Sequence, residues 1–508
     1  MDNSLSSSLI GQRKIRLEKL SKLRELGINP YPSKSERDIQ IGEIKEDFEK
    51  HKGMIHTVVG RVTGWRTHGK LIFADIKDQT GSIQIILKSD WLEKNLTEGY
   101  LEWDTLELLD LADFIEVGGE IGKSKSGEIS VLAKSIKLLA KSLRPIPRKL
   151  SNKEQKFRRR YLDLVINTDR VKLFERKAKF WEIQRGFLKK EGFLEVEVPV
   201  LEVVTGGADA KPFLTHHNAL DIDLYLRIST ELYQKRLIGG GFEKIYTFGP
   251  NFRNEGMDDE HLQEFYDIEW YWAYANYRDN MELVKKLFLE IAQQLYGKTK
   301  FTTRGHTFDL ADEWKEIDFT QVIKENFNID IFDDSDEKIL SALKEKGVEI
   351  EGEINRNRMI DNMWKVIRAT ILGPAFLVNH PMFVSPLAKA REDDSRLTER
   401  FQVIIAGSEL GNGYSEINDP QDQLSRFVNQ QKLREKGDEE AQMLDIDFVE
   451  MLEYGMPPTS GYGQSERVFW FLEDVSGREG TIFPQMRTEL EESTKRIYED
   501  ILPKAKKK

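Results

Sequence analysis

The sequence predicts an α+β protein in which a small β-barrel precedes a larger domain built on a largely antiparallel sheet flanked by helices. The chain has 508 residues, enough for two or more domains. Five short runs of period two begin at Thr57, and the later two thirds of the chain mix strands and helices without regular βαβ alternation. These three observations favour two domains of the α+β class.

The composition narrows the classes of function. The net charge is -11, so the chain as a whole is not a polybasic nucleic-acid binder, although a local basic face is not excluded. The absence of cysteine rules out disulfides and thiolate metal sites. The N-terminus lacks the apolar core of a secretory signal, and no run of 18 apolar residues occurs. We therefore expect a soluble, cytoplasmic protein with no membrane partner.

The first part of the chain divides into a helical and a strand-rich segment. Residues 9–26 place apolar residues at helical spacing among many Lys and Arg, so we assign residues 1–53 to an N-terminal helical extension. Residues 54–142 contain five strand-like runs separated by glycine-containing turns. Five short strands in about ninety residues suit a barrel of the OB type, which binds single-stranded nucleic acid on one face.

The remaining segments are assigned from their composition and spacing. Residues 143–168 hold two prolines and a dense basic cluster, which predicts a linker. The larger domain is assigned to residues 169–503, and the basic residues 504–508 are expected to form a tail. The larger domain opens with apolar residues spaced like one helix face: Val171, Phe174, Ala178, Trp181 and Leu188.

Three segments occur in an order that points to a specific chemistry. They are "EGFLEVEVPVL" from Glu191, "FRNE" from Phe252 with the polar loop and aromatic strand that follow, and "GYGQSERVFWFL" from Gly461. With "TGGADAKPFL" and "NGYSEINDPQDQLSRF", they resemble motifs 1, 2 and 3 and the intervening parts of the class II lysyl-tRNA synthetases. The resemblance runs from about Gly60 to Arg487. It implies a class II synthetase catalytic domain, a homodimer, and ATP, L-lysine and tRNA(Lys) as substrates.

The reaction that the resemblance implies explains the residue types. The amino-acid carboxylate attacks the α-phosphate of ATP, so two anions must be brought together. A guanidinium can hold a carboxylate and a phosphate in one plane, which an ammonium cannot do. The resemblance gives this role to Arg253 and names Arg467 as the second catalytic arginine. No general base is needed, because the attacking carboxylate is already ionised, and catalysis is mostly positioning and electrostatic stabilisation.

The resemblance also implies the residues of the nucleotide site and the metal. Adenine would lie between Phe265 and Arg467, and Mg²⁺ would bind Glu409 and phosphate oxygens, as a hard cation prefers. The implied ATP-binding residues are Arg253, Glu255, His261, Phe265, Glu409 and Arg467.

The implied amino-acid pocket binds a cation at each end of lysine. Gly207 and Glu231 would meet the α-ammonium, whereas Glu416 and Tyr271 would receive the ε-ammonium. A carboxylate at the end of an aromatic-walled pocket would favour lysine over the aspartate or asparagine of sister enzymes, because a neutral substrate leaves that acid unpaired. The implied lysine-binding residues are Gly207, Glu231, Arg253, Glu269, Tyr271, Asn412, Tyr414 and Glu416.

In the barrel, the resemblance implies contacts to the tRNA anticodon. Phe73 would stack on an unpaired base, and Gln84 and Glu128 would contact base edges.

The sequence departs from the family pattern in three places. Glu260 stands where relatives usually have an arginine at the ATP γ-phosphate, and Gln402 stands where many have a second magnesium carboxylate. Motif 3 is one residue short before Glu466. An acid beside a polyphosphate must be offset, either by a metal ion that the acidic loop recruits or by a cation from elsewhere, for which Arg487 is a candidate.

Two other functions fit parts of the pattern. One is a ligase that lysylates a protein side chain, although known relatives of that kind lack the anticodon barrel. The other is a non-catalytic RNA-binding paralogue, which the departures favour and the intact Arg253, Glu416 and Arg467 oppose.

Overall fold

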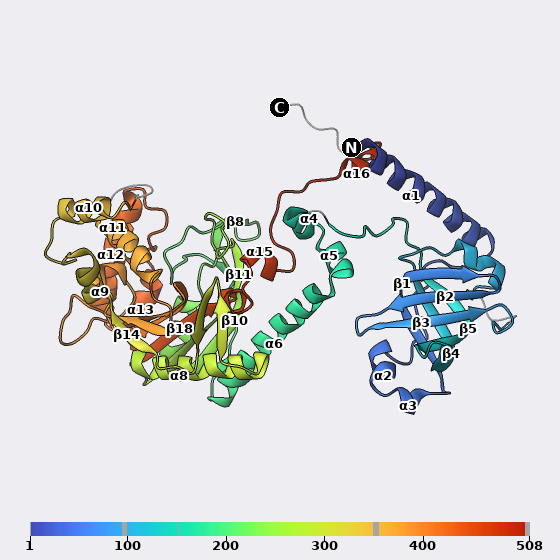
Figure 1. Ribbon diagram of the computed structural model, residues 1–508. Helices are drawn as coiled ribbons and strands as arrows, with labels where there is room; N and C mark the ends of the chain where they lie inside the picture. Colours follow the sequence, from blue (N-terminus) through green and yellow to red (C-terminus); the bar gives the residue numbers. More distant parts are fainter. Residues whose placement is uncertain (1, 94–98, 151, 349–354, 503–508) are drawn as a thin grey trace. The chain divides into compact units, whose positions relative to one another are not determined.

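The computed structural model describes residues 2–93, 99–150, 152–348 and 355–502, and they form two compact units (Figure 1). The barrel unit comprises the described residues of Met1–Ile166 and Met486–Lys508, and the sheet unit comprises those of Asn167–Gln485. The catalytic domain assigned to 169–503 stays a prediction, and in the structure the described chain from Met486 belongs to the barrel unit. The tail assigned to residues 504–508 lies outside the described residues.

The barrel unit is built on five strands that close in the order β1-β2-β3-β5-β4. β3 and β5 pair in parallel, and the other four pairs are antiparallel. Alternate residues of β2, Ile72, Ala74 and Ile76, are buried, as period two requires. The predicted five-stranded barrel is confirmed. The elements of this unit are α1 (Asp2–Glu25), α2 (Ile41–Glu46), α3 (Phe48–His51), β1 (Ile55–His68), β2 (Leu71–Lys77), β3 (Ser82–Lys88), η1 (Trp103–Leu108), β4 (Phe114–Lys123), β5 (Ile129–Ala140), α4 (Lys153–Arg158), α5 (Arg160–Ile166) and α16 (Glu492–Ile497).

The N-terminal helices add to the barrel core. Leu23 of α1, Ile41 and Ile44 of α2 and Phe48 of α3 belong to the same buried cluster as the strand residues. The segment assigned as the linker contains the helices α4 and α5.

The sheet unit contains an eight-stranded sheet in the order β14-β15-β16-β17-β18-β11-β10-β6. Five of its strand pairs are antiparallel, and the two parallel pairs, β14 with β15 and β10 with β6, lie at its edges. The predicted antiparallel character is therefore confirmed. The elements of this unit are α6 (Thr168–Lys190), β6 (Leu194–Glu195), β7 (Leu201–Glu202), β8 (Leu214–His217), β9 (Ile222–Leu226), α7 (Glu231–Gly239), β10 (Lys244–Phe252), β11 (Glu264–Ala273), α8 (Tyr277–Ile291), η2 (Ala292–Tyr296), β12 (Lys300–Thr303), β13 (His306–Asp309), β14 (Lys315–Asp318), α9 (Phe319–Phe327), α10 (Asp336–Glu345), α11 (Arg356–Arg368), β15 (Ala375–Val378), η3 (Met382–Val384), β16 (Arg400–Ile405), β17 (Ser408–Ser415), α12 (Pro420–Glu435), α13 (Ile446–Tyr454), β18 (Thr459–Ser465), α14 (Arg467–Leu472) and α15 (Gly477–Gly480).

Helices cover the large sheet through three separate cores, and in one of them α9, α10 and α11 pack with Leu377 of β15 and Ile404 of β16. α6 and α8 contribute to one cluster together with Trp270 of β11, whereas α7, α12 and α13 contribute to another with Tyr271 of the same strand. Neighbouring residues of one strand thus face different cores. The helix predicted from residue 169 is present as α6. On its predicted face, Phe174, Ala178 and Trp181 line one groove, and Trp181 and Leu188 are also buried in the core.

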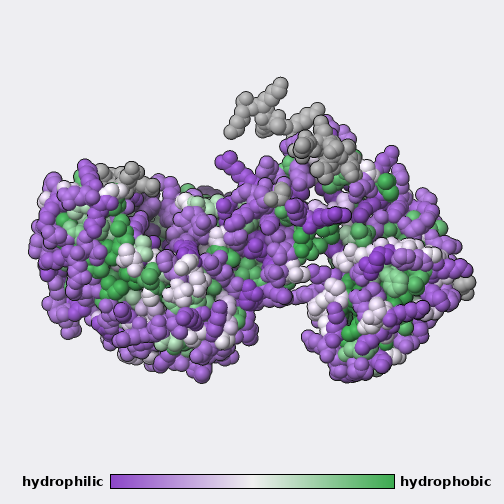
Figure 2. All heavy atoms as spheres, in the orientation of Figure 1, coloured by the Kyte–Doolittle hydropathy of each residue, from purple (hydrophilic) through white to green (hydrophobic). Residues whose placement is uncertain are grey.

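Hydrophilic residues cover most of the surface in the view of Figure 2. Among the described residues, no helix has the length and apolar character that a membrane crossing requires.

Glu202 of β7 generates a prediction about stability. Its side chain is buried and one carboxylate oxygen has no hydrogen-bond partner, and burial raises its pKa to about 8. A carboxyl group with a raised folded-state pKa stabilises the fold at low pH, and this contribution is lost as pH rises from its unfolded value of about 4.3 through about 8. Glu202→Gln should therefore flatten the fall in melting temperature over this window. Glu182→Gln, at an exposed site on α6, is the control, and equal pH slopes in parent and Glu202→Gln would contradict the assignment.

Candidate functional site

One cavity of about 380 Å³ in the sheet unit gathers most of the residues singled out from the sequence. This volume suits a small-molecule site. The sequence predicts thirteen residues for the ATP and lysine sites. Two of them, Glu255 and His261, do not line the cavity. The eleven that line it are Gly207, Glu231, Arg253, Phe265, Glu269, Tyr271, Glu409, Asn412, Tyr414, Glu416 and Arg467.

The alternation of side chains along β11 builds one wall of the cavity. β11 pairs with β10 on one side and with β18 on the other, so its backbone is fixed along its whole length. Phe265, Asp267, Glu269 and Tyr271 lie at alternate positions and all line the cavity. Sequence reasoning missed Asp267, a buried residue with one carboxylate oxygen that lacks a hydrogen-bond partner.

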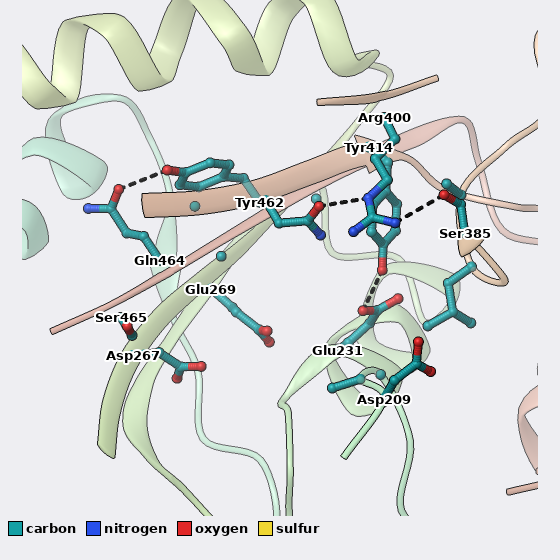
Figure 3. A pocket seen from close by; sticks show the side chains of 18 of the residues that line it. Asp209, Glu231, Asp267, Glu269, Ser385, Arg400, Tyr414, Tyr462, Gln464 and Ser465 are labelled. Atoms are coloured by element: carbon teal, nitrogen blue, oxygen red, sulfur yellow. Dashed lines mark hydrogen bonds between the residues drawn. The ribbon is translucent and has the colours of Figure 1, made fainter. Parts of the chain in front are cut away.

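A buried ammonium organises the inner end of the cavity. Lys235 of α7 lies one helical turn after Glu231, and its Nζ is 2.5 Å from Glu231 Oε1 and forms a second ion pair with Glu416. Tyr414 donates its hydroxyl to Glu231 Oε2 over 2.6 Å (Figure 3). Burial lowers the pKa of Lys235, but the two carboxylates outweigh it and raise that pKa overall. Lys235 is therefore charged, and it holds two of the predicted lysine-binding residues in place.

The third carboxylate at this end, Glu269, is held by neutral donors. Ser229 Oγ and the Thr230 backbone N–H both donate to it over 3.1 Å. Burial raises the pKa of Glu269, and these hydrogen bonds oppose the rise. In Figure 3 it reaches into the cavity from the same strand as Asp267.

The close approach of β18 to these acids requires a glycine. A β-carbon at Gly461 would lie 2.5 Å from Tyr271 Cε1 and would also collide with the Glu416 carboxylate. The glycine therefore gives Tyr271 and Glu416 the space in which they meet.

Arginines flank the middle of the cavity. The Arg253 guanidinium lies over the Phe265 ring at 5.2 Å from its centroid. Arg400 donates from Nε to Asn412 Oδ1 over 2.8 Å and from Nη1 to Ser385 Oγ over 3.0 Å (Figure 3). Arg400 was missed from the sequence, because nothing in its own stretch distinguishes it from a surface arginine.

At the outer end, Glu260 binds two arginines. Its carboxylate pairs through one oxygen with Arg304 and through the other with Arg467. Burial lowers the pKa of Arg467 to about 10, so it is charged at neutral pH. The cations that offset Glu260 of the acidic loop are thus Arg304 and Arg467. Arg487, the candidate named from the sequence, belongs to the other compact unit.

The two predicted residues outside the cavity lie on the loop between β10 and β11. Glu255 is exposed and accepts the backbone N–H of Lys211 over 3.3 Å. His261 is also exposed, and its Nδ1 lies 2.8 Å from Asp258 Oδ2. Their assignment to ATP stays a prediction.

Glu409 can serve as one oxygen ligand of a metal. Gln402 donates to its Oε1 over 2.8 Å, and the Arg368 guanidinium is 3.6 Å from its Oε2. Across the described residues, no group of three or more His, Cys, Asp or Glu could by itself hold a metal ion. A single carboxylate fits Mg²⁺ that arrives with the phosphates of ATP, because Mg²⁺ often takes one or two carboxylates together with substrate phosphates.

The three predicted anticodon residues lie on one part of the barrel unit. Gln84 donates to Glu128 Oε2 over 2.9 Å and accepts from Ser130 Oγ over 3.1 Å. Gln84 pairs with Asp75, which is two residues along β2 from Phe73, so Phe73 and Gln84 share a barrel face. Phe73 is half-buried rather than part of the core, and its ring lies 6.3 Å from that of His68.

Comparison with known proteins finds two families that match parts of this chain. The family described as "tRNA synthetases class II (D, K and N)" matches residues 152–487, and the one described as "OB-fold nucleic acid binding domain" matches residues 56–139. The chain is 44% identical over 488 residues to a lysine–tRNA ligase of Fervidobacterium nodosum, covering 94% of each chain. It is 44% identical over 469 residues to that of Thermotoga maritima, covering 90% of this chain and 92% of the relative. For the ligase of Thermoanaerobacter pseudethanolicus the identity is 43%, with 93% and 95% covered. From these matches, and from an OB-fold barrel that precedes an antiparallel catalytic sheet, we conclude that the chain belongs to the class II tRNA synthetases of the D, K and N type.

Proposed function

We propose that this chain is an ATP-dependent lysine–tRNA ligase, which forms lysyl-adenylate from L-lysine and ATP and transfers the lysyl group to tRNA(Lys). The arrangement of charge at the inner end of the cavity carries the proposal. Three carboxyl groups, Glu231, Glu269 and Glu416, line this end, and the buried ammonium of Lys235 pairs with two of them, Glu231 and Glu416. Burial raises the pKa of Glu269 and Glu416, and an amino acid with two ammonium groups supplies cations that favour the ionised form of these buried carboxyl groups. The names of the relatives support the same conclusion.

In this proposal, the two ends of lysine meet different acids. Glu231 and the backbone at Gly207 bind the α-ammonium, and Glu416 with Tyr271 binds the ε-ammonium, while Glu269 and Tyr414 complete the pocket. Asn412 and Arg253 bind the carboxylate. Arg253 lies between this carboxylate and the α-phosphate, so it can bring both anions into reacting geometry.

Adenine stacks between Phe265 and Arg467 in this proposal, and Glu255 and His261 close over the nucleotide when their loop rearranges. Glu409 binds Mg²⁺ that accompanies ATP, and the metal supplies additional positive charge at the phosphates. The barrel binds the tRNA anticodon through Phe73, Gln84 and Glu128. We infer a cytoplasmic homodimer from the family.

The proposal is tested by lysine-dependent exchange of pyrophosphate into ATP, measured with each of the twenty amino acids and with and without tRNA. Lysine alone should support strong exchange, and tRNA(Lys) should be charged. Charging of a protein and not of tRNA would instead favour the protein-lysylating ligase. The absence of exchange with any amino acid would favour the non-catalytic RNA-binding paralogue.

Glu416→Gln should weaken lysine recognition. The substitution keeps the shape of this fully buried side chain and removes its charge. Loss of a charge-assisted hydrogen bond costs about 1.5–3 kcal/mol, so the KM for lysine should rise by about one to two orders of magnitude. Exchange kinetics over a range of lysine concentrations measure this, with the exposed Glu282→Gln as control. An unchanged lysine dependence in Glu416→Gln would remove Glu416 from the site.

Lys235→Met should lower stability, because it leaves Glu231 and Glu416 without their shared counter-ion. Removal of one partner of a buried ion pair costs about 3–5 kcal/mol. Addition of Glu416→Gln should restore part of the loss, since one uncompensated charge then disappears. Denaturant unfolding of the parent, both single variants and the double variant gives the coupling energy. Strictly additive effects would show that Lys235 and Glu416 do not interact.

Phe73→Ala should weaken tRNA binding. Removal of an aromatic side chain that stacks on a base costs about 1–3 kcal/mol. The dissociation constant for tRNA(Lys) should therefore rise by about five- to 150-fold, and exchange without tRNA reports whether the variant is folded. If tRNA(Lys) binds Phe73→Ala as tightly as the parent, the anticodon does not contact this ring.

A further inference from the structure

At the outer end of the cavity lie Glu260 and Arg304, two residues to which the proposed function gives no role. Each oxygen of the Glu260 carboxylate forms an ion pair with an arginine. One oxygen pairs with Arg304 and the other with Arg467. Ser408 Oγ also donates to Glu260 Oε1 over 3.2 Å, and Arg304 Nη1 lies 3.4 Å from the same hydroxyl. An anionic group with two oxygens is thus held between two guanidiniums and a hydroxyl, beside the cavity-lining Glu409 and Arg467.

This set of donors is the set that a phosphate group requires. Guanidiniums bind carboxylates and phosphates through the same pair of parallel N–H groups, so a site that holds one of these anions can hold the other. The Glu260 carboxylate is covalently part of a loop, and its side chain is mostly buried while the neighbouring Asp258 and Asp259 are exposed. Glu260 therefore occupies the position that a ligand anion would take.

The position of Arg304 is fixed by the element that carries Arg467. Arg304 and Gly305 form the two-residue turn between β12 and β13, and Thr303 Oγ1 donates to the Phe471 carbonyl of α14 over 2.9 Å. The Arg304 N–H donates to Asp474 Oδ1 over 3.1 Å, just beyond the same helix. α14 begins at Arg467, so these two hydrogen bonds hold the hairpin against the helix that presents the second guanidinium.

The backbone at Arg304 supports a role for its side chain. Its φ is +53°, in the left-handed region, and that of Gly305 is +80°. Turns of this kind favour asparagine, aspartate or glycine at the first position, because a longer L side chain is strained there. An arginine at this position is thus not explained by the turn itself.

We propose that Arg304 is a further ATP-binding residue, which receives the terminal phosphate of ATP after Glu260 has left its place between the two guanidiniums. Arg467 donates to the same phosphate through its N–H edge, while the face of its guanidinium stacks on adenine. This inference rests on the proposed function, since it assigns a new residue to the same nucleotide site. Glu260 acts as an internal anion that keeps the two arginines in position when ATP is absent and competes with the phosphate when ATP binds. The chain thereby obtains a second phosphate cation from a hairpin instead of from the loop after Arg253.

The test compares ATP with AMP, because AMP lacks the phosphates that Arg304 would contact. Calorimetric binding in magnesium buffer should show that Arg304→Gln weakens ATP about tenfold, as loss of one charge-assisted hydrogen bond predicts, and leaves AMP within about twofold. Arg304→Lys, which keeps the charge, should recover part of the ATP affinity. Glu260→Gln should tighten ATP severalfold relative to AMP, because the competing anion is gone.

Arg278→Gln is the matched control. Arg278 is exposed to the same degree as Arg304, 46% against 45%, and also pairs with one glutamate, Glu316. Arg304 differs in its partner, because the other oxygen of Glu260 binds the cavity-lining Arg467. Substitution of Arg278 should change neither affinity.

Two outcomes would overturn the inference. If Arg304→Gln weakens ATP and AMP equally, the residue only supports the fold of the site, and if it changes neither, Arg304 does not contact the phosphates. A failure of the proposed function would be distinct from both. The parent would then show no lysine-dependent exchange, whatever the ratio of ATP to AMP affinity in the variants.

Discussion

The ion pairs of Lys235 with Glu231 and Glu416 are the interaction on which the amino-acid pocket depends. Burying an ammonium and carboxylates costs several kcal/mol per ion, and an apolar cluster of similar volume is often at least as stable. Stability therefore does not explain why three carboxylates and one ammonium share the inner end of the cavity. Recognition explains it better. Lys235 pairs with only two of the three carboxyl groups, and a substrate with two ammonium groups brings further cations to them.

The antiparallel sheet makes this concentration of charge possible. Because β11 is paired on both sides, every second residue from Phe265 to Tyr271 faces the cavity without any freedom of register. The residues between them, Ile268 and Trp270, anchor the strand in the apolar core behind it. A one-residue slip would exchange the two sets and place carboxylates in that core. The core therefore fixes the geometry of the polar site, and Gly461 of β18 provides the space that its side chains need.

How much the sequence predicts depends on whether the determining signal is local. Period two along β1 to β5 and the mixed pattern after residue 169 predict the barrel and the antiparallel sheet, because strand alternation is visible residue by residue. The spacing from residue 169 predicts α6 and one face of it, but helical spacing does not indicate which part of that face meets the core and which part lines a groove. The spacing of Glu231 and Lys235 is visible in the sequence, although their shared partner Glu416 lies far along the chain. Arg304 had no local signal, since only the folded hairpin brings it to Glu260.

The departures from the family pattern are consistent with ATP binding when the charges are compared by their positions in the folded site. Glu260 in place of an arginine makes the loop more acidic. Gln402 in place of a carboxylate removes one negative charge near Glu409. Gln402 instead donates a hydrogen bond to Glu409, so position 402 holds a neutral donor where a second carboxylate would repel this acid. Arg304 pairs with the acid at position 260, and Arg467 pairs with its other oxygen. The affinity for a polyphosphate depends on the charges that surround it in the folded site, and not on the order of residues in a motif. An acidic motif 2 loop is thus compatible with ATP binding as long as the loop can move and leave two guanidiniums for the phosphate.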